Sequence, residues 1–564
     1  MIYYSSDDFD IKKLGSFYQF DKTTFRVFAP EHKNLFLVIE DDVYEMHKNG
    51  MCFEIALGGN LELVKYHYMN EKGIRFKDPF SYLSLGKNSI VLDKSKFIST
   101  KVYPGETNSC IIYEASVRDF SSSKSYKGKY KSKFLSLIEN NLKIDDYYMI
   151  GLDYLKNIGI SHLQLMPIFD YDNDFSEYNW GYNPIAYNYL KKDYIYNQDD
   201  PYAYINEFRS VVNTLHENNI RVVLDVVFNH VYNVASNDLE KMLPGHFFRK
   251  KEDGSLANGT LCGNEINSED VFVSEYICLM VQRYLELFDI DGIRMDLMNI
   301  LDINLVNKLK QTMTIYKKDF LVYGEGWNMG DVLADEKRAS ISNYRKLDNV
   351  AMFNDKFRDI ITKYLCEDNS VLDDVKKVIA ADESYLDSVH SINYVECHDG
   401  FTFIDRMKAY KPDDELWLNE ARARLAIALV IISRGTPFIH MGQEFYRTKN
   451  GIENSYNCGD EINRIDWNLR VTNNRVCDYF KDLVNIRKDN HVFDKKDVNI
   501  SFTDYYDCLI YRLDNYVILI NPTRNDYVYD DGKQYDVIFD KNGKCEYRSG
   551  ILNIPACSLL ICKE

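Results

Sequence analysis

Four short apolar segments of this sequence each end in residues that could carry out nucleophilic or acid–base chemistry. These residues are Asp225 and His230, Arg294 and Asp296, Glu325, and His398 and Asp399. A single acid at the end of a strand is most often a helix cap, because its side chain accepts hydrogen bonds from the free N–H groups of the next helix. Four occurrences in succession are too many to assign to capping alone, so we interpret them as one site.

Two of these acids have surroundings that favour different charges at neutral pH. Arg294 lies two residues before Asp296, and the two-residue period of a strand places both side chains on one face. An arginine there would keep the aspartate ionised, as a nucleophile requires. Glu325 lies between glycines, after an apolar run and near Trp327, which favours a raised pKa and a retained proton. One ionised and one protonated carboxyl group are what glycoside hydrolysis needs.

The same segments resemble the four ordered signature regions of the α-amylase family of glycoside hydrolases, family 13. They read DVVFNH, DGIRMDLM, YGEGW and NYVECHDG. The resemblance implies that Asp296 is the nucleophile, Glu325 the general acid and base, and Asp399 the residue that stabilises the oxocarbenium-like transition state. The residues that it assigns to the subsite of the scissile sugar are Asp225, His230 and His398. Whether Asp225 contacts the sugar or only pairs with Arg294 stays open.

Further motifs resemble one branch of this family, the type I pullulanases. YNWGYNP at residues 178–184 is similar to their signature, and the resemblance implies that Tyr182 stacks beneath the scissile glucose and that Trp180 lines the same site. GEGW, which contains Trp327, and GQEFYRTK at 442–449 are similar as well. The block FRVFAP…YHYM…DPFSYL resembles a carbohydrate-binding module of family 48. The resemblance implies retaining hydrolysis of α-1,6 linkages in pullulan, starch, glycogen and limit dextrins.

A retaining enzyme should hold the carboxyl groups of Asp296 and Glu325 about 5 to 6 Å apart, whereas an inverting enzyme needs roughly 6.5 to 9.5 Å to admit water between them. We therefore expect the shorter separation here.

A few positions depart from the pullulanase pattern. Asn183, Met295, Cys397 and Gly400 stand where aspartate, phenylalanine, serine and asparagine are frequent, and HDGFT is similar to isoamylases and glycogen debranching enzymes. No carboxylate is lost, so the departures concern linkage or chain-length preference. Isoamylase-like cleavage, mixed α-1,4/α-1,6 hydrolysis and, from another class, a catalytically silent glucan-binding protein stay open as alternatives. The three intact carboxylates argue against the last.

The elements that hold these residues alternate between strand and helix. Eight apolar runs predict buried strands: 111–117, 162–168, 221–227, 291–297, 320–325, 350–354, 392–396 and 436–442. Between them, the spacing of Ile205, Phe208, Val212 and Leu215 is typical of an amphipathic helix. The pattern predicts a multidomain α/β fold with a central (β/α)8 TIM barrel at 106–491. Short strands on either side predict an N-terminal β-sandwich at 1–105 and a small C-terminal β-sandwich at 492–564.

The composition excludes several classes of partner. The 564 residues carry 68 Lys and Arg against 86 Asp and Glu, a net charge of −18, and such a field repels nucleic acid and anionic lipid. The longest apolar run, 425–432, is far shorter than the roughly 20 residues that span a bilayer. No signal peptide is visible, so we expect a cytoplasmic protein. An α-glucan substrate is the expected partner, with no nucleic acid and no membrane, and we expect a monomer.

Cofactors are not expected either. Twelve cysteines occur without a CxxC pair, which disfavours a zinc site or a disulfide framework. Asp170, Asp172, Asp174 and Glu177 form an acidic loop that could hold calcium. The loop lacks the EF-hand glycine and spacing, and we interpret it as solvated. We predict no metal in the site and leave structural calcium open.

The tryptophans are unevenly distributed. All four of them, Trp180, Trp327, Trp417 and Trp467, lie between residues 105 and 492. Flat indole rings are favoured platforms for stacking on sugars. Because the N-terminal module has none, we expect it mainly to pack against the barrel.

Overall fold

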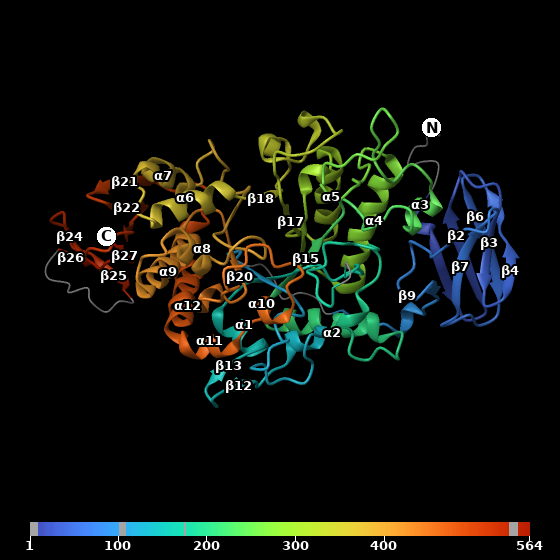
Figure 1. Cartoon of the computed structure of the whole chain (residues 1–564), viewed down its shortest axis with the longest axis horizontal. Helices are drawn as coiled ribbons and strands as arrows, with labels where there is room; N and C mark the ends of the chain where they lie inside the picture. The colour runs from blue at the N-terminus through green and yellow to red at the C-terminus, as the bar shows by residue number, and fades with distance from the viewer. Residues whose placement is uncertain (1–9, 101–108, 174–175, 541–550) are drawn as a thin grey trace.

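A closed barrel of eight strands forms the centre of the molecule, with β-sheets at either end of it (Figure 1). The computed structural model describes residues 10–100, 109–173, 176–540 and 551–564. The N-terminal sheets (blue in Figure 1) and the C-terminal sheets (red) lie at opposite ends of the long axis. The predicted fold class is confirmed. The domain boundaries stay predictions, and residues 101–108, where the first was drawn, lie outside the described residues.

The barrel strands are parallel and follow one another in chain order, and the last pairs with the first. They are β11 (Ile112–Ala115), β14 (His162–Leu165), β15 (Arg221–Val226), β16 (Gly292–Met295), β17 (Leu321–Gly324), β18 (Ala351–Phe353), β19 (Ser391–Asn393) and β20 (Thr436–His440). Seven lie within one of the eight predicted runs, and β19 begins one residue before its run, 392–396. Nearly every strand residue is buried, because helices cover the outside of the barrel and side chains fill its inside.

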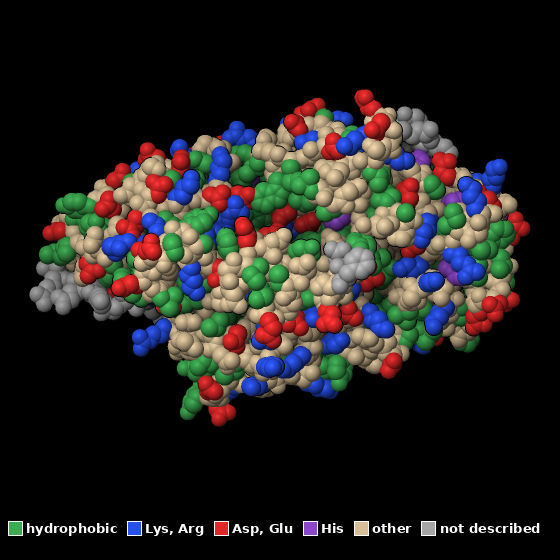
Figure 2. All heavy atoms as spheres, viewed as in Figure 1, with side chains coloured by type: hydrophobic (Ala, Val, Ile, Leu, Met, Phe, Trp, Pro, Cys, Tyr) green, Lys and Arg blue, Asp and Glu red, His purple; other side chains and the backbone are tan. Residues whose placement is uncertain are grey.

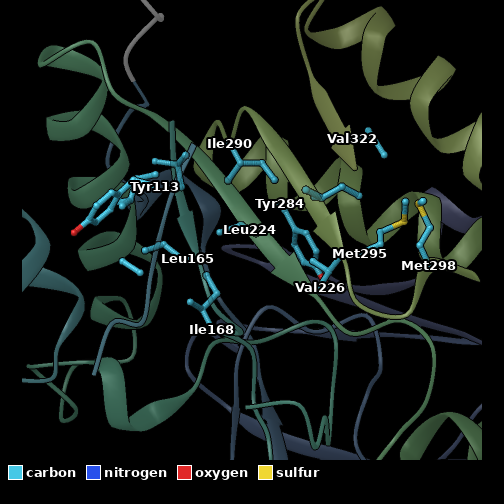
Figure 3. Close-up of a cluster of buried hydrophobic side chains, with 14 of the residues drawn as sticks. Tyr113, Leu165, Ile168, Leu224, Val226, Tyr284, Ile290, Met295, Met298 and Val322 are labelled. Atoms are coloured by element: carbon cyan, nitrogen blue, oxygen red, sulfur yellow. The ribbon is translucent and has the colours of Figure 1, made fainter. Parts of the chain in front are cut away.

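Side chains of the barrel strands alternate between these two environments. Val223 and Tyr323 belong to a buried cluster formed by the barrel strands themselves. Leu224 instead joins the large core between strands and helices (Figure 3). The same period of two places Asp225 after Val223 and Glu325 after Tyr323. The pleat that buries the apolar interior therefore also directs these two acids into the mouth of the barrel.

Helices surround the barrel. They are α1 (Leu152–Ile158), α2 (Ala203–Glu217), α3 (Asp238–Met242), α4 (Val271–Phe288), α5 (Ile303–Tyr316), α6 (Asp355–Leu365), α7 (Leu372–Ala380), α8 (Phe403–Tyr410), α9 (Leu416–Ile432), α10 (Asp460–Asn463), α11 (Trp467–Thr472) and α12 (Asn474–Asp489). The predicted amphipathic helix is α2, and its four apolar positions are all buried. That prediction is confirmed.

Helix capping is performed by other acids than those of the predicted site. Asp270 accepts hydrogen bonds from the first N–H groups of α4, and Asp302 does the same for α5. Among the described helices, none has a cap from the strand-end acids Asp225, Asp296, Glu325 or Asp399. Capping therefore does not explain those four acids.

The N-terminal domain consists of two packed sheets. One contains β1 (Gly15–Gln19), β2 (Lys22–Phe28), β6 (Cys52–Gly58) and β5 (His47–Asn49); the other contains β4 (Asp42–Glu45), β3 (Leu35–Ile39), β7 (Lys65–Asn70), β10 (Asn88–Ile90), β9 (Ser84–Leu85) and β8 (Arg75–Phe76). Phe25 and Tyr66 meet between the sheets, with ring centroids 4.9 Å apart. The domain packs on α4, where Phe28 stacks on Phe272 at 4.4 Å.

The C-terminal domain is smaller. Its main sheet contains β21 (Ile500–Tyr505), β22 (Cys508–Leu513), β23 (Tyr516–Asn521), β27 (Ser558–Lys563) and β25 (Asp536–Phe539), and β24 (Tyr527–Asp530) pairs with β26 (Ile551–Ile554). A separate apolar cluster, which includes Leu519 and Leu552, lies between the two sheets. Phe539 contacts Tyr479 of α12 at a centroid distance of 5.1 Å, so this domain also packs on the barrel helices.

Within the described residues, no helix combines the length and the apolar character needed to cross a bilayer. The described cysteines are free thiols. In the same part of the chain, no group of three metal-ligating side chains could hold an ion. Asp174 of the acidic loop lies outside the described residues.

Candidate active site

One buried arginine joins three of the predicted site residues. Arg294, at the end of β16, is 1% exposed. Its Nη1 donates to Asp225 Oδ1 and to Asp296 Oδ1, each at 3.0 Å, and its Nη2 donates to Glu325 Oε1. Burial alone would lower the pKa of Arg294, but Asp225 and Glu325 raise it well above its ordinary value. The guanidinium therefore stays charged and fixes the carboxyl groups around it.

Asp296 is held at both carboxylate oxygens. Oδ1 accepts from Arg294, and Oδ2 accepts from the Asn229 amide at 2.8 Å. The same amide nitrogen also donates to the backbone oxygen of Asp296 at 2.8 Å. His230 lies behind it, with Nδ1 2.6 Å from Asn229 Oδ1. Burial lowers the pKa of His230, although the nearby Asp296 charge opposes this.

The surroundings of Glu325 favour the protonated form of its carboxyl group. Its Oε1 accepts from Arg294 and its Oε2 from the Leu297 N–H at 3.1 Å. Burial, and then the nearby negative charges of Asp296 and Asp399, raise the pKa of Glu325 to about 8, although Arg294 opposes them. At neutral pH this carboxyl group keeps its proton, as a general acid must.

His398 and Asp399 form an ion pair on the other side of the site. His398 Nε2 lies 3.4 Å from Asp399 Oδ2, and its Nδ1 lies 2.8 Å from Oε1 of Glu114. Burial would lower the pKa of His398, but Asp399 and Glu114 raise it well above its usual value. Desolvation would raise the pKa of Asp399, but the His398 charge and hydrogen bond, with Arg294 and Lys449, lower it to about 2. The Asp399 side chain is 59% exposed, so an ionised oxygen is available to a ligand.

Aromatic rings form one wall of the site. The Tyr182 ring stacks on His398 with centroids 4.9 Å apart and an interplanar angle of 17°. Its hydroxyl donates to Asp225 Oδ2 at 2.7 Å, which fixes the ring against rotation. Trp180 meets His398 edge-on at 5.2 Å and is only 7% exposed, so it supports the histidine from behind. Trp327 is half-buried, two residues after Glu325.

A hollow in the middle of the face shown in Figure 2 has acidic side chains (red) and a histidine (purple) at its base. The hollow lies over the barrel. A barrel of this kind carries its reacting groups at the carboxyl ends of its strands. The hollow opens this end of the barrel to solvent.

Three residues near the site were not chosen from the sequence. Glu114 lies within β11, and its carboxylate accepts from the backbone N–H of His398 at 2.9 Å and lies 2.8 Å from the ring Nδ1. Lys449 donates to the His398 carbonyl at 3.0 Å and lies 5.3 Å from the Trp180 ring centroid. Asn229 holds Asp296. An acid inside the apolar run IIYEASV and the lysine that ends GQEFYRTK were the signals that could have identified the first two.

Two other residues near the site make their hydrogen bonds away from Arg294. Glu396, two residues before His398, is buried against His440 at 3.2 Å and the Phe403 N–H at 2.5 Å. Tyr178 is buried and donates to Asp119 at 2.6 Å. Both side chains bond to other buried groups of the protein, so we interpret their roles as structural.

The departures from the pullulanase pattern do not disturb the charged groups. Met295 faces the core between strands and helices (Figure 3), away from the barrel mouth. Gly400 has φ of 73°, in the left-handed region that asparagine also tolerates. Cys397 is half-buried, and its thiol points to the Asp399 carbonyl at 3.7 Å. Met295 contacts the site only through its backbone, since its carbonyl accepts from the Glu325 N–H at 3.1 Å.

Comparisons with known proteins identify the family. The family model described as alpha amylase, catalytic domain, matches residues 149–241. The pullulanase of Bacillus subtilis strain 168 is 33% identical over 519 residues, which cover 85% of this chain and 72% of that protein. This chain belongs to the pullulanase family.

Solved pullulanases share the architecture from end to end. The Paenibacillus barengoltzii pullulanase, crystallised with maltohexaose and α-cyclodextrin, has a TM-score of 0.93 and 28% identity over 99% of this chain and 96% of that chain. A glycogen debranching enzyme of Escherichia fergusonii is 26% identical over 392 residues, 60% of this chain and 57% of its own. The resemblance to type I pullulanases seen in the motifs is confirmed.

Proposed function

We propose that this chain hydrolyses α-1,6-glucosidic linkages in pullulan and branched α-glucans, and that the configuration at the anomeric carbon is retained. The observation that carries the proposal is the shared guanidinium of Arg294, which holds the ionisable groups of Asp296 and Glu325 at the mouth of one barrel. Two oxygens bonded to neighbouring nitrogens of one guanidinium suit the short carboxyl separation of about 5–5.5 Å that retention needs.

In the first proposed step, Glu325 gives its proton to the glycosidic oxygen while Asp296 attacks the anomeric carbon. The C–O bond to the leaving chain breaks, and an ester forms between Asp296 and the glucosyl unit. In the second step, Glu325 takes a proton from water, the water oxygen attacks the anomeric carbon, and the ester bond to Asp296 breaks. Each residue returns to its starting protonation state.

Asp399 and the aromatic wall have supporting roles in the same proposal. The exposed carboxylate of Asp399, kept ionised by His398, can accept hydrogen bonds from sugar hydroxyls that strengthen as positive charge develops on the ring. Tyr182 offers its ring face to the sugar that is cut, because Asp225 holds its hydroxyl and His398 supports its other face. We also propose that residues 1–105 form a carbohydrate-binding module of family 48.

The test is product analysis on pullulan. The wild-type chain should release maltotriose, and Asp296→Asn should release nothing while remaining folded. Panose as the main product would indicate α-1,4 cleavage and would overturn the α-1,6 assignment. Unfolded or aggregated Asp296→Asn protein would be recognised by its circular dichroism. Equal product from wild type and the folded variant would remove Asp296 from its proposed role.

Isoamylase-like debranching is the second candidate. It is favoured by HDGFT at 398–402 and by the likeness to the Escherichia fergusonii glycogen debranching enzyme. An enzyme of that kind would debranch amylopectin and leave pullulan intact. A chain that binds glucans and cuts neither polymer would instead be the silent binder.

A further inference from the structure

Trp417 is the one tryptophan whose position the proposed chemistry does not explain. Trp467 is fully buried in the core, Trp180 supports His398, and Trp327 follows Glu325. Trp417 lies in the first turn of α9 and is 52% exposed. A large apolar ring at the surface costs free energy in water unless another molecule covers it.

The Trp417 ring lines a groove of about 790 Å³. The groove lies between the barrel and the C-terminal domain: α9 forms one side, the junction of α11 with α12 another, and the turns at 524–526 and 555–556 the third. Its polar lining includes the side chains Arg424, Asn474, Arg475 and Asp526. A volume of this size admits several linked sugar rings.

The aromatic parts of the groove are held in place. The Trp417 indole N–H donates to the Glu415 carboxylate, and the Tyr446 hydroxyl donates to the Glu420 carbonyl at 2.8 Å. Asp526 accepts from the Ala556 N–H at 2.8 Å, so a carboxylate of the C-terminal domain is also fixed. Rings and acceptors that are already oriented lose little entropy when a ligand binds.

The charges of the groove favour a neutral ligand. Three arginines, Arg424, Arg475 and Arg524, are offset by Glu420 and Asp526. Arg524 is further engaged with Glu367 at 3.2 Å and Asp414 at 3.3 Å. Guanidinium and carboxylate groups beside an exposed indole can hydrogen-bond sugar hydroxyls while the ring stacks on a sugar face.

The groove and the active site are at the same end of the barrel. A helix that leads into a barrel strand runs antiparallel to it, so the first turn of α9 lies at the carboxyl end of β20. Tyr446 belongs to the loop after β20, and three residues later Lys449 contacts the His398 carbonyl. One loop therefore connects the groove with the candidate active site.

We infer that this groove is a second binding site for an α-glucan chain, in which Trp417 stacks on a glucosyl ring. The inference rests on the proposed function, because it takes the ligand class from the substrate. A chain bound there stays attached to the enzyme while one of its branches enters the cleft.

The test compares a polymer with a short substrate. Trp417→Ala should raise KM for amylopectin about tenfold, the change expected when one stacked ring is lost, with kcat unchanged. Its kcat/KM for a short branched maltooligosaccharide should equal that of wild type, because such a substrate cannot reach both sites. Trp417→Phe should restore part of the polymer affinity. Tyr410→Ala removes another exposed aromatic ring, 59% exposed, and should leave both substrates unaffected.

Retention in amylopectin-containing native gels separates this inference from the proposed function. In the Asp296→Asn background, Trp417→Ala should migrate faster than its parent, whether or not the wild-type chain cuts pullulan. Equal migration of the two proteins, or an equal loss of kcat/KM on the polymer and on the short substrate, would overturn the second site. A failure to cut any glucan with the migration difference intact would overturn only the function.

Discussion

Asp296 and Glu325 touch the same guanidinium and yet have different environments. Asp296 is bonded at both oxygens, by Arg294 and by the Asn229 amide. Glu325 is buried and faces two other carboxylates, and its pKa is raised to about 8. At the residue scale, the proposed roles of nucleophile for Asp296 and general acid for Glu325 therefore depend on the groups that surround each acid in addition to Arg294.

The pH dependence of the enzyme should report this raised pKa. A general acid must be protonated, so kcat/KM on pullulan should fall as the pH rises through about 8 and Glu325 loses its proton. Glu325→Gln should lower kcat by roughly 10²- to 10⁴-fold and remove the alkaline limb of the pH–rate profile. Asp399, with a pKa of about 2, should not contribute to the profile in the working range.

Glu396→Gln is the matched control for that experiment. Burial raises the pKa of Glu396 to about 8 as well, but its contacts are with His440 and the Phe403 N–H rather than with Arg294. The variant should keep the alkaline limb. If Glu396→Gln lost the alkaline limb and Glu325→Gln kept it, the essential proton would belong to Glu396, and our assignment of the general acid would be wrong.

At the scale of elements, the close approach of β16 and β17 explains why a glycine, Gly324, precedes Glu325. A Cβ atom at Gly324 would meet the Met295 carbonyl oxygen of β16 and the Met298 side chain. A Cβ atom at Gly326 would chiefly meet the sulfur of Met352, the end of a flexible side chain. The position before Glu325 is therefore constrained by backbone, and the position after it mainly by a side chain that can move.

Gly324→Ala should therefore displace the end of β17 and with it Glu325. A shift of about 1 Å in a catalytic group can cost roughly a hundredfold in rate, and we expect a loss of that order in kcat. Gly326→Ala should cost much less, because Met352 can change rotamer. Steady-state kinetics of the two variants, with circular dichroism to confirm folding, would decide. Equal losses would show that flexibility around Glu325, rather than strand contact, matters.

The elements were largely predictable because buried parallel strands are apolar on both faces. Asp225, Asp296 and Glu325 stood out as acids at the ends of such strands. Glu114 did not, because it lies within its strand and its partner His398 is 284 residues away. Lys449 was hidden for a similar reason, since its contacts with His398 and Trp180 depend on how the loop after β20 folds back. Residue patterns could therefore not predict contacts between residues that are distant in the sequence.

At the scale of the whole molecule, the N-terminal domain and the barrel share an apolar interface. Phe28, at the end of β2, is fully buried against Phe272 of α4. Phe80 meets Tyr276 of the same helix at a centroid distance of 5.4 Å. This supports the expectation that the domain packs against the barrel, and it places α4 between the N-terminal sheets and the catalytic strands.

Phe28→Ala should therefore destabilise the barrel and not only the domain that carries it. Truncation of a buried phenylalanine costs about 3–5 kcal/mol, and we expect the main thermal transition to move down in calorimetry. Phe20→Ala, at a residue that is 75% exposed, should leave the transition within experimental error. A separate low-temperature transition in Phe28→Ala, with the main one unmoved, would mean that the two domains unfold independently.

Esterification of Asp296 in the proposed first step would erase its negative charge. That charge is one of the causes of the high pKa of Glu325, while the opposing charge of Arg294 would remain. The pKa of Glu325 should then fall while the sugar is attached, and rise again when the ester is hydrolysed. The carboxyl group would thus be a proton donor when a donor is needed and a proton acceptor one step later. Through Arg294 and its neighbours, the covalent state of one acid sets the timing of the other.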